Sequence, residues 1–146
     1  MIEKKHKRLE LLDLPAEYSN LDQTLNSAFK ILEDASKNRR SLFHTPTLST
    51  FDGNRVSIRT MVLREFDPDK RLIRFHTDYR SIKIHQLKKD SHGAVHGYDP
   101  SLKIQIRLDG KINLHHKDEI TKGSWELSKD MSKECYFVGG PPGSKI

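Results

Sequence analysis

Apolar side chains recur at three- and four-residue steps near the start of the chain, which is the pattern of an amphipathic helix. The positions concerned are Leu21, Leu25, Ala28, Phe29, Leu32 and Ala35. Ser19 or Asn20 is expected to cap the start of this helix, and Asn38 is expected to lie at its end. The Arg39-Arg40 pair suits the negative end of the helix dipole. The pattern therefore predicts one long helix after a charged stretch that ends at Pro15.

After Ser41 the hydrophobic period shortens to two, which indicates strands. Strands are predicted over residues 43–51, 56–63, 72–77, 93–98 and 103–114. The motifs Asp52-Gly53-Asn54 and Asp67-Pro68-Asp69 are turn signals between them. Alternation places Val56, Ile58, Thr60 and Val62 on one face of their strand, opposite Ser57, Arg59, Met61 and Leu63. In the last strand it places Ile104, Ile106 and Leu108 opposite Lys103, Gln105 and Arg107.

Two shorter helices are expected later in the chain. Residues 79–89 suit a helix with Ile82 and Leu87 as its apolar anchors and Asp78 as its N-cap. A second helical stretch lies around residues 122–128 and carries Trp125, which is expected to pack in the core rather than to serve as a stacking platform. The glycine- and proline-rich residues 139–143 are expected to form a loop.

The order of these elements excludes a parallel βαβ alternation, because two-residue turns join antiparallel neighbours. Short strands with turn signals favour a mainly β fold, a small antiparallel barrel with attached helices. Residues 1–18 are expected to form a tail or arm, and residues 19–146 a single domain. Six phenylalanines and one tryptophan make a thin core. We therefore expect dimerisation to bury further surface.

The chain has 146 residues, with 26 Lys and Arg against 20 Asp and Glu, a net charge of +6. This surplus suits nucleic acid, an anionic lipid surface or a phosphorylated small molecule. No apolar run approaches the ~20 residues of a membrane span, and no apolar segment follows the basic N-terminus as a signal peptide requires. A single cysteine, Cys135, allows no internal disulfide, so a reducing, cytoplasmic location is expected.

Cations and hydroxyl groups gather in the segment RTMVLREFDPDKRLIRFHTDYRSIK, which begins at Arg59 and ends at Lys83. Arg59 and Arg64 bracket an apolar segment, where a guanidinium is costly unless it meets an anion or a carboxylate. The stretch from Thr77 to Lys83 is a strand end that enters a helix, where amide groups beside a hydroxyl and a lysine suit a phosphate. Two cations with a helix start fit a phosphate monoester. The alternative is that these arginines form ion pairs with carboxylates on a solvent-exposed surface: Glu65, Asp67, Asp69 and Asp78.

The ordered motifs RTMVLR, RFHTDYRS-x-K and Q-x-R-x-x-G resemble the pyridoxamine 5′-phosphate oxidase superfamily of FMN-binding split barrels. The likeness covers roughly residues 20–144 and is nearer to the oxidase-related, FMN-binding branch, where TD-x-RS-x-K is typical. The resemblance implies an antiparallel split β-barrel with flanking α-helices, a homodimer, and FMN bound at the dimer interface. It also implies a flavoprotein, either an FMN-dependent oxidoreductase or a flavin-binding module without catalysis.

Carried over position by position, the resemblance assigns a set of cofactor-binding residues. They are Arg59, Thr60, Met61, Val62, Leu63, Arg64, His76, Thr77, Arg80, Ser81, Lys83 and Gln105. Within this set, Arg59, Ser81 and Lys83 match residues that hold the phosphate. Ile82 stands where the oxidase has an arginine, and Arg80 is its expected replacement.

The remaining members of this set are expected to contact the flavin itself. The backbone of residues 60–63 resembles the strand that lies along the flavin ring. His76 and Thr77 match the tyrosine-threonine pair that closes the flavin site. Gln105 is similar to the glutamine that reaches the isoalloxazine, and alternation points it away from Ile104 and Ile106.

Other positions depart from the oxidase pattern. Arg64 stands where the oxidase has a lysine for the substrate phosphate, and keeps the charge. Tyr136 and Ser144 resemble two further ligands of that phosphate, whereas the arginine position between them is Gly140 here. The sequence stops at Ile146, before the segment that in the oxidases supplies flavin contacts and substrate-binding arginine and histidine. Flavin binding is therefore expected, and oxidation of pyridoxamine 5′-phosphate itself is not.

Two other functions stay open at this point. The net charge and a small barrel also suit nucleic-acid binding, although the basic residues lack the interleaved aromatics of stacking proteins. Haem binding by the same split barrel is the second alternative, because the chain has eight histidines. His92 and His96, like the adjacent His115 and His116, lack the spacing of a zinc site and are expected to be packed or solvated. Cys135 has no C-x-x-C partner and no sequence support for a nucleophilic role.

Overall fold

The computed structural model describes residues 7, 9–134, 136–137, 140 and 142. The chain divides into two compact units. The first unit comprises Met1–Ser49, Ile58–His76 and Ala94–Asp109, and the second comprises Thr50–Ser57, Thr77–Gly93 and Gly110–Ile146. The residues that the sequence assigns to a cofactor site are therefore distributed over both units.

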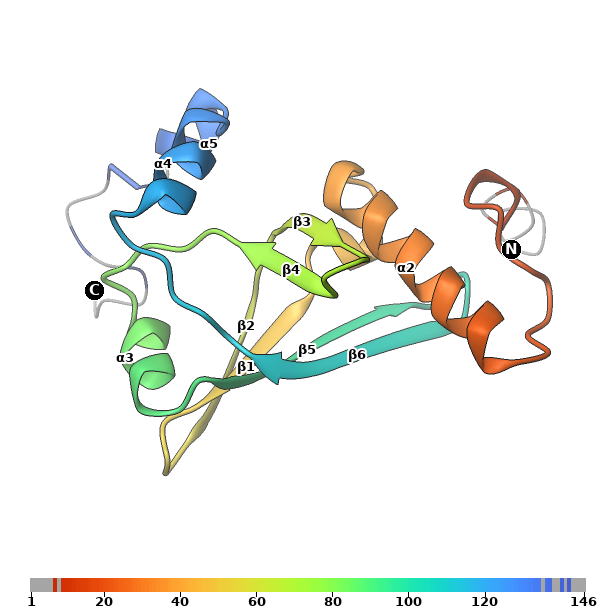
Figure 1. The fold of residues 1–146 in the computed structure, drawn as a ribbon, viewed down its shortest axis with the longest axis horizontal. Coiled ribbons are helices and arrows are strands. Elements are labelled where there is room, and N and C mark those ends of the chain that lie inside the picture. The colour runs from red at the N-terminus through yellow and green to blue at the C-terminus, as the bar shows by residue number, and fades with distance from the viewer. Residues whose placement is uncertain (1–6, 8, 135, 138–139, 141, 143–146) are drawn as a thin grey trace. The chain divides into compact units, whose positions relative to one another are not determined.

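Helices flank two sheets in the described residues (Figure 1). The helices are α2 (Leu21–Lys37), α3 (Ile82–Lys89), α4 (Glu119–Glu126) and α5 (Asp130–Glu134), with the short 3-10 helix η1 (Leu42–His44). The strands are β1 (Thr47–Phe51), β2 (Val56–Thr60), β3 (Leu63–Asp67), β4 (Leu72–Phe75), β5 (His92–Asp99) and β6 (Ile104–Lys111). One sheet has the order β2-β1-β5-β6, and the other pairs β3 with β4 antiparallel. This is the mainly β fold class that the sequence predicts.

Helix α2 confirms the predicted long helix and its boundaries. The Asn20 side chain caps the start by accepting a hydrogen bond from the Gln23 amide at 2.9 Å. Asn38 ends the helix, and its amide donates to the Asp34 carbonyl at 2.8 Å. The predicted apolar stripe is wrong at its N-terminal end, because Leu21 is 85% exposed.

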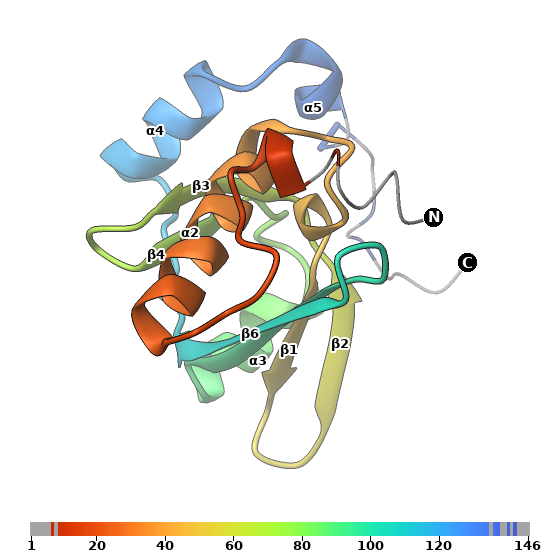
Figure 2. The same ribbon diagram turned by 90° about the vertical axis from the view of Figure 1, so that its right-hand side faces the viewer.

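The core of the first unit lies between α2 and the β3–β4 hairpin, which lie side by side in Figures 1 and 2. Ile31, Leu32 and Ala35 of α2 are buried in this core together with Leu63 and Phe66 of β3. The buried apolar residues of α2 therefore lie in its C-terminal half, where the hairpin covers them. This explains why the first turn of the helix stays exposed despite its apolar residues.

The segment before α2 also contributes to the first unit. Leu14 is buried in the core, and Leu9 and Leu12 pack against it. Lys30 of α2 donates hydrogen bonds to the backbone carbonyl and the carboxylate of Asp13, at 2.9 and 2.6 Å. The end of the predicted charged tail is thus an arm that packs on the core.

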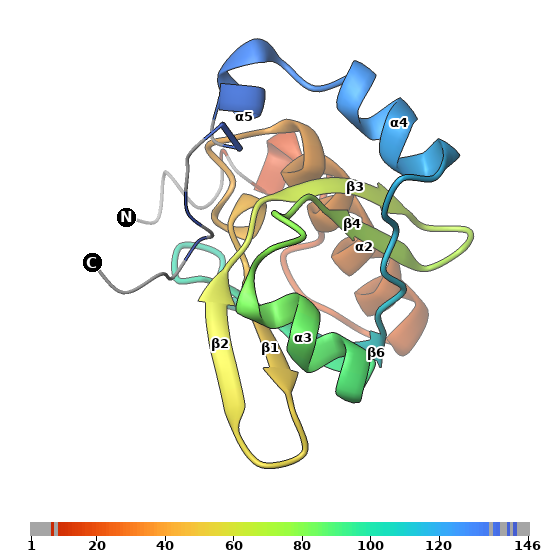
Figure 3. The same cartoon turned by 90° about the vertical axis from the view of Figure 1, so that its left-hand side faces the viewer.

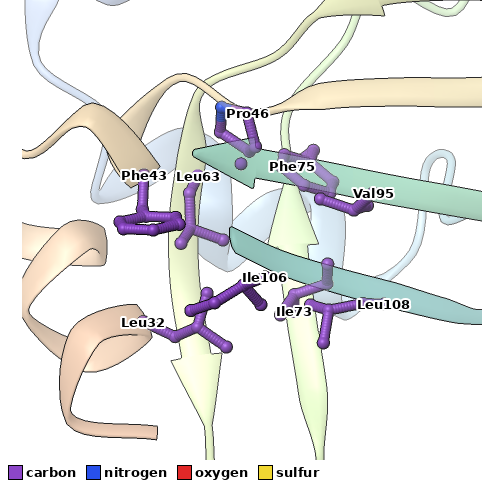
Figure 4. A pocket seen from close by; sticks show the side chains of 10 residues that line it. Leu32, Phe43, Pro46, Leu63, Ile73, Phe75, Val95, Ile106 and Leu108 are labelled. Atoms are coloured by element: carbon purple, nitrogen blue, oxygen red, sulfur yellow. The ribbon is translucent and has the colours of Figure 1, made fainter. Parts of the chain in front are cut away.

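A small apolar space remains inside the first unit (Figure 4). Its lining residues are Leu32, Phe43, Pro46, Leu63, Ile73, Phe75, Val95, Gly97, Ile106 and Leu108. Its volume of about 10 Å³ is barely enough for one water molecule. Because no lining side chain is polar, this space is a packing defect of the core rather than a ligand site.

The strand predicted over residues 43–51 is wrong in its first half. Residues Leu42–His44 form η1, and β1 begins only at Thr47. Pro46 precedes it, and proline has no amide hydrogen to donate to a strand ladder. The ladder therefore starts at the first residue after the proline.

The single strand predicted over residues 56–63 is in fact two strands. β2 ends at Thr60, and β3 begins at Leu63 in the other sheet. Between them the Met61 amide donates to the Pro46 carbonyl at 2.8 Å, and Val62 carries the chain onward. Alternation alone does not reveal this break, because the period of two continues through it.

The later strands agree with the sequence apart from their ends. β4 stops at Phe75 rather than at residue 77, and β6 stops at Lys111 rather than at residue 114, while β5 is slightly longer than predicted. In β6 Ile106 is buried and Gln105 is exposed. The predicted alternation of this strand is therefore confirmed.

In the second unit, the predicted turn joins β1 to β2 (Figure 2). The Asp52 amide donates to the Arg55 carbonyl at 3.2 Å. The Asp52 carboxylate accepts hydrogen bonds from the amides of Asn54 and Arg55, at 2.9 and 2.7 Å. Gly53 has a φ of 92°, a left-handed conformation that glycine adopts without steric cost. The aspartate and the glycine thus specify this turn locally.

Helix α3 begins at Ile82, later than the predicted start at residue 79, and its N-cap is Ser81 rather than Asp78. Its buried apolar residues are Ile84 and Leu87. The predicted anchor Ile82 is 60% exposed, so that assignment is wrong. An eight-residue helix buries only a narrow stripe, and the three-residue step from Ile84 to Leu87 leaves Ile82 outside it.

The predicted helix around residues 122–128 is observed as α4, Glu119–Glu126, and is followed by α5, which the sequence does not predict. Trp125 is 43% exposed, so its predicted place in a core is wrong. Its ring makes edge contacts with Tyr136 and Phe137, with centroids 6.2 Å apart in both pairs. Within the described residues, the ring of Trp125 is thus covered by its neighbours along the chain.

Candidate functional site

A cluster of one lysine and two hydroxyl groups lies at the start of α3 in the second unit. The Lys83 ammonium donates hydrogen bonds to Thr77 Oγ1 at 2.9 Å and to Ser81 Oγ at 3.0 Å. The two hydroxyl oxygens are 3.5 Å apart. We call Thr77, Ser81 and Lys83 the cradle. The structure thus brings together three of the residues that the sequence assigns to the cofactor.

The cradle includes the N-terminus of α3. Ser81 is buried and is the N-cap residue, yet its side chain makes no capping hydrogen bond within the described residues. The first turn of the helix also contains no acidic residue. Backbone amides at a helix start carry partial positive charge and bind anions. The cradle therefore combines a lysine, two hydroxyls and a helix start that no described side chain caps, which is a donor set suited to a phosphate.

Arg80, the fourth member assigned to this segment, bonds to its neighbour instead. Its guanidinium donates to both carboxylate oxygens of Asp78, with the shortest distance 2.6 Å. Hydrogen bonds from the Arg80 side chain lower the pKa of the Asp78 carboxyl, and Asp78 in turn raises the pKa of Arg80. Of the two predicted roles for the cations of this segment, Arg80 therefore shows ion pairing with a carboxylate. Its expected role as a replacement phosphate ligand gains no support from this geometry.

A buried polar network fixes α3 on the β1–β2 hairpin, and Figure 3 shows the two side by side. The Thr50 hydroxyl donates to Gln86 Oε1 at 2.7 Å, and Gln86 Nε2 donates to Ser57 Oγ at 2.8 Å. Thr50 and Gln86 are buried. Satisfied polar networks in a low-dielectric interior are rigid. The sequence analysis did not single out these residues, and no local pattern reveals them.

In the first unit, Arg59 lies on β2 and is half-buried. Its guanidinium donates to the Leu48 carbonyl at 3.3 Å. Burial lowers the pKa of this guanidinium, because desolvation disfavours its charged form. After Arg59, Thr60 is exposed, whereas the side chains of Met61 and Leu63 are buried. The placement of the backbone of residues 60–63 along a flavin ring stays a prediction.

Arg64 occupies an irregular position in β3. The pairing steps from Leu63 opposite Phe75 to Glu65 opposite Arg74, so Arg64 is the extra residue of a β-bulge. Bulges often lie beside functional sites, where they redirect a side chain. The Nε atom of Arg64 is buried and has no hydrogen-bond partner in the described part of the chain. This guanidinium is therefore suited to an anionic group of a ligand.

His76 follows β4 and lies half-buried near the same arginine. Burial lowers the pKa of His76, and the positive charges of Arg64 and Arg74 lower it further, while Glu65 opposes them. Arg74 and Glu65 form an ion pair at 2.5 Å. The lowered pKa favours the neutral form of His76.

Gln105 is exposed on β6, as the strand alternation predicts. Its Oε1 accepts a hydrogen bond from Nε2 of His96 on β5 at 3.1 Å. With Oε1 engaged, the amide group of Gln105 is left to donate. The described geometry thus gives this glutamine a defined orientation, which the sequence did not indicate.

The remaining candidate residues are a cysteine, a serine and the histidine pairs. Cys135 and Ser144 lie outside the described residues. Among the residues described, no three His, Cys, Asp or Glu side chains are placed to hold a metal ion. His92 instead contacts Asp90, and His115 contacts Asp118, both at 2.8 Å. None of the described helices combines the length and the apolar character needed to cross a membrane.

Comparison with known families decides the classification. Residues 23–116 match the family of the pyridoxamine 5′-phosphate oxidase, FMN-binding domain. The chain belongs to this family. The match to the pyridoxamine 5′-phosphate oxidase FMN-binding domain includes all six described strands, α3 and the cradle.

A solved structure supports the fold of this domain. It is the crystal structure of a pyridoxamine 5′-phosphate oxidase-related, FMN-binding protein from Nostoc punctiforme. The two structures superpose with a TM-score of 0.67 at 22% sequence identity, over 81% of this chain. This chain spans only 65% of the length of that protein. The predicted FMN-binding split-barrel fold is confirmed. No curated protein matches the chain in sequence.

Proposed function

We propose that this domain binds FMN, with the flavin phosphate in the cradle formed by Thr77, Ser81 and Lys83. The observation that carries this proposal is the placement of the Lys83 ammonium within 3.0 Å of both hydroxyl oxygens at the start of α3. Membership of the FMN-binding domain family makes a flavin phosphate the expected anion. The other cofactor residues predicted from the sequence, including Arg59 and Gln105, remain part of the proposal.

The donor set of the cradle fits a phosphate monoester. An ammonium and two hydroxyls supply hydrogen bonds to its oxygens, and charge-assisted bonds of this kind are the stronger ones. The start of α3 adds the helix dipole. No carboxylate lies in the first turn of α3 to repel the phosphate. Asp78 is buried, but Arg80 neutralises it through paired hydrogen bonds.

We infer that the domain acts as a flavin-dependent oxidoreductase. Bound FMN supplies the hydride chemistry, and the protein binds and orients it. The amide of Gln105 is available to donate to the flavin ring, and neutral His76 places no charge there. Arg64, with its buried Nε atom, is the proposed contact for an anionic group of the substrate.

We also propose that the domain works as a homodimer with FMN at the interface. Val56 and Ile58 lie two residues apart on the same face of β2 and are 66% and 70% exposed. Large apolar side chains exposed on a sheet suit a protein interface. Sedimentation analysis with and without FMN tests this point, and a monomer under both conditions contradicts it. The single cysteine supports a reducing, cytoplasmic location.

The visible spectrum of the purified protein tests the cofactor. We expect a flavin spectrum, or saturable FMN binding when the protein is isolated colourless. Titration with riboflavin, which lacks the phosphate, should show much weaker binding. Absence of FMN binding contradicts the proposal, and a Soret band in place of a flavin spectrum identifies haem instead. Equal affinity for FMN and riboflavin retains a flavoprotein but removes the cradle as the phosphate site.

A further inference from the structure

An aromatic stack lies beside the cradle in the second unit. The rings of Tyr79 and His116 are parallel to within 10°, with centroids 3.7 Å apart. The Lys88 ammonium lies over the Tyr79 ring, 4.8 Å from its centroid. Stacked aromatic pairs and cations over aromatic rings are both favourable contacts. Two residues from different parts of the chain therefore hold the Tyr79 ring.

Tyr79 occupies the middle of the loop that forms the cradle. Thr77 precedes it, and Ser81 and Lys83 follow it. Within the loop, the Ser81 amide donates to the Asp78 carbonyl at 3.1 Å. This hydrogen bond folds the loop on itself but does not anchor the loop to a segment distant in the sequence. The Tyr79 ring does so, because His116 follows β6 and lies far from the loop along the chain.

We propose that His116 is a positioning residue for the flavin phosphate. By stacking on Tyr79 it holds the loop between Thr77 and Lys83, so that the two hydroxyls and the ammonium converge before the ligand arrives. Lys88 supports the same ring from α3. This inference rests on the proposed function. It adds a contribution to FMN affinity from a residue outside the set assigned from the sequence.

The substitutions that test the Tyr79–His116 stack follow from its geometry. A stack requires a flat ring, so His116→Phe retains it and His116→Ala removes it. A change in loop position affects the phosphate of FMN but not riboflavin, which lacks that group. The ratio of the two affinities thus separates a role in the cradle from a general loss of structure.

The experiment measures dissociation constants for FMN and riboflavin with the wild-type protein, His116→Ala, His116→Phe and Tyr79→Ala. We expect His116→Ala to weaken FMN binding about fivefold, the size typical of an aromatic pair, and to leave riboflavin binding within about twofold. His116→Phe should restore most of the FMN affinity. The double variant His116→Ala/Tyr79→Ala should weaken FMN binding no more than Tyr79→Ala alone, because each substitution removes the same Tyr79–His116 stack.

Other outcomes overturn the inference in distinguishable ways. Unchanged FMN affinity in His116→Ala, with the wild type still preferring FMN to riboflavin, rejects the role of His116 alone. Equal losses for FMN and riboflavin, or no recovery in His116→Phe, also reject it. Failure of the wild type to bind FMN rejects the proposed function and this inference together. Circular dichroism of each variant establishes that the fold is retained.

Discussion

Lys83 donates a 2.9 Å hydrogen bond to the hydroxyl of Thr77, six residues before it in the chain. This bond joins the segment that follows β4 to the first turn of α3. A second bond from the same ammonium reaches Ser81. Because these polar groups are held together within the protein, little ordering is required when an anion binds. Preorganisation of this kind raises affinity by lowering the cost of association.

Replacement of Lys83 by methionine should weaken FMN binding about tenfold or more, because a charge-assisted hydrogen bond is lost. Riboflavin binding should change little, since it has no phosphate. Fluorescence titration of both flavins provides the measurement. Lys89→Met is the matched control, because Lys89 is an exposed lysine at the other end of α3. Equal losses in Lys83→Met and Lys89→Met would mean that only the net charge matters.

Arg59→Ala tests the first-unit residue that the family resemblance assigns to the phosphate. We expect a loss of FMN affinity of about tenfold or more, because a guanidinium makes strong charge-assisted bonds to phosphate. Arg59→Lys should recover only part of it, since lysine cannot bind in a bidentate manner. The same titration applies. Wild-type affinity in Arg59→Ala would remove this residue from the cofactor site and leave the proposed role of the cradle unchanged.

Gln86→Leu should destabilise the protein by ~1–3 kcal/mol, because the Thr50 hydroxyl loses the acceptor that it has in the buried network. Urea unfolding followed by circular dichroism measures this loss. Thr50→Val alone should also be destabilising. The double variant should lose less than the sum of the two, because each change removes the same hydrogen bond. Strict additivity would show that the two side chains do not stabilise each other.

Gly97→Ala should destabilise the core of the first unit. A Cβ atom at position 97 would lie 2.5 Å from Cδ1 of the Phe43 ring, and overpacking of this kind costs ~1–3 kcal/mol. Phe43→Leu should relieve part of the clash in the double variant. Gly110→Ala is the control, since a Cβ there meets nothing within 4 Å. Thermal unfolding compares the variants, and equal stability of Gly97→Ala and Gly110→Ala would contradict the packing described.

His76 should make stability fall as the solution is acidified. Burial and neighbouring arginines lower its pKa in the folded protein below the ordinary value of 6.5. Between the lowered pKa and 6.5, the unfolded chain binds a proton that the folded protein does not. The free energy of unfolding therefore rises with pH in this window, and the contribution of His76 is lost as the pH falls from 6.5 through the lowered pKa.

His76→Gln should accordingly lose less stability than the wild type between about pH 7 and pH 5. Urea unfolding at several pH values measures the two slopes, and His85→Gln provides a control at an exposed histidine. The pKa of His76 can also be followed directly by NMR. A value above 6.5 in the folded protein would contradict the expected direction.

Short-range patterns in the sequence determined several features of this protein. Asn20 and Asn38 mark the ends of α2 because capping involves groups within one turn of the helix. Asp52 and Gly53 specify the β1–β2 turn for the same reason. The grouping of Thr77, Ser81 and Lys83 was also predictable, since six residues at a strand-to-helix junction suffice to bring these side chains together.

Other features depend on partners distant in the sequence, and only the tertiary structure decided them. Leu21 is exposed because no element among the described residues covers the first turn of α2, although its apolar side chain fits the stripe. The break between β2 and β3 follows from the bond between Met61 and Pro46. A period of two describes the faces of a strand but not where its pairing ends.

The residues that hold the cradle in place are also distant from it in the sequence. Gln86 bonds to Thr50 and Ser57, which are 36 and 29 residues away in the chain, and His116 stacks on Tyr79 across a similar separation. No periodicity or motif connects positions so far apart. The sequence by itself therefore determined that Thr77, Ser81 and Lys83 lie together, because these residues are neighbours along the chain. Which side chains hold them in place was decided by the fold, because packing brings together residues that local patterns leave unrelated.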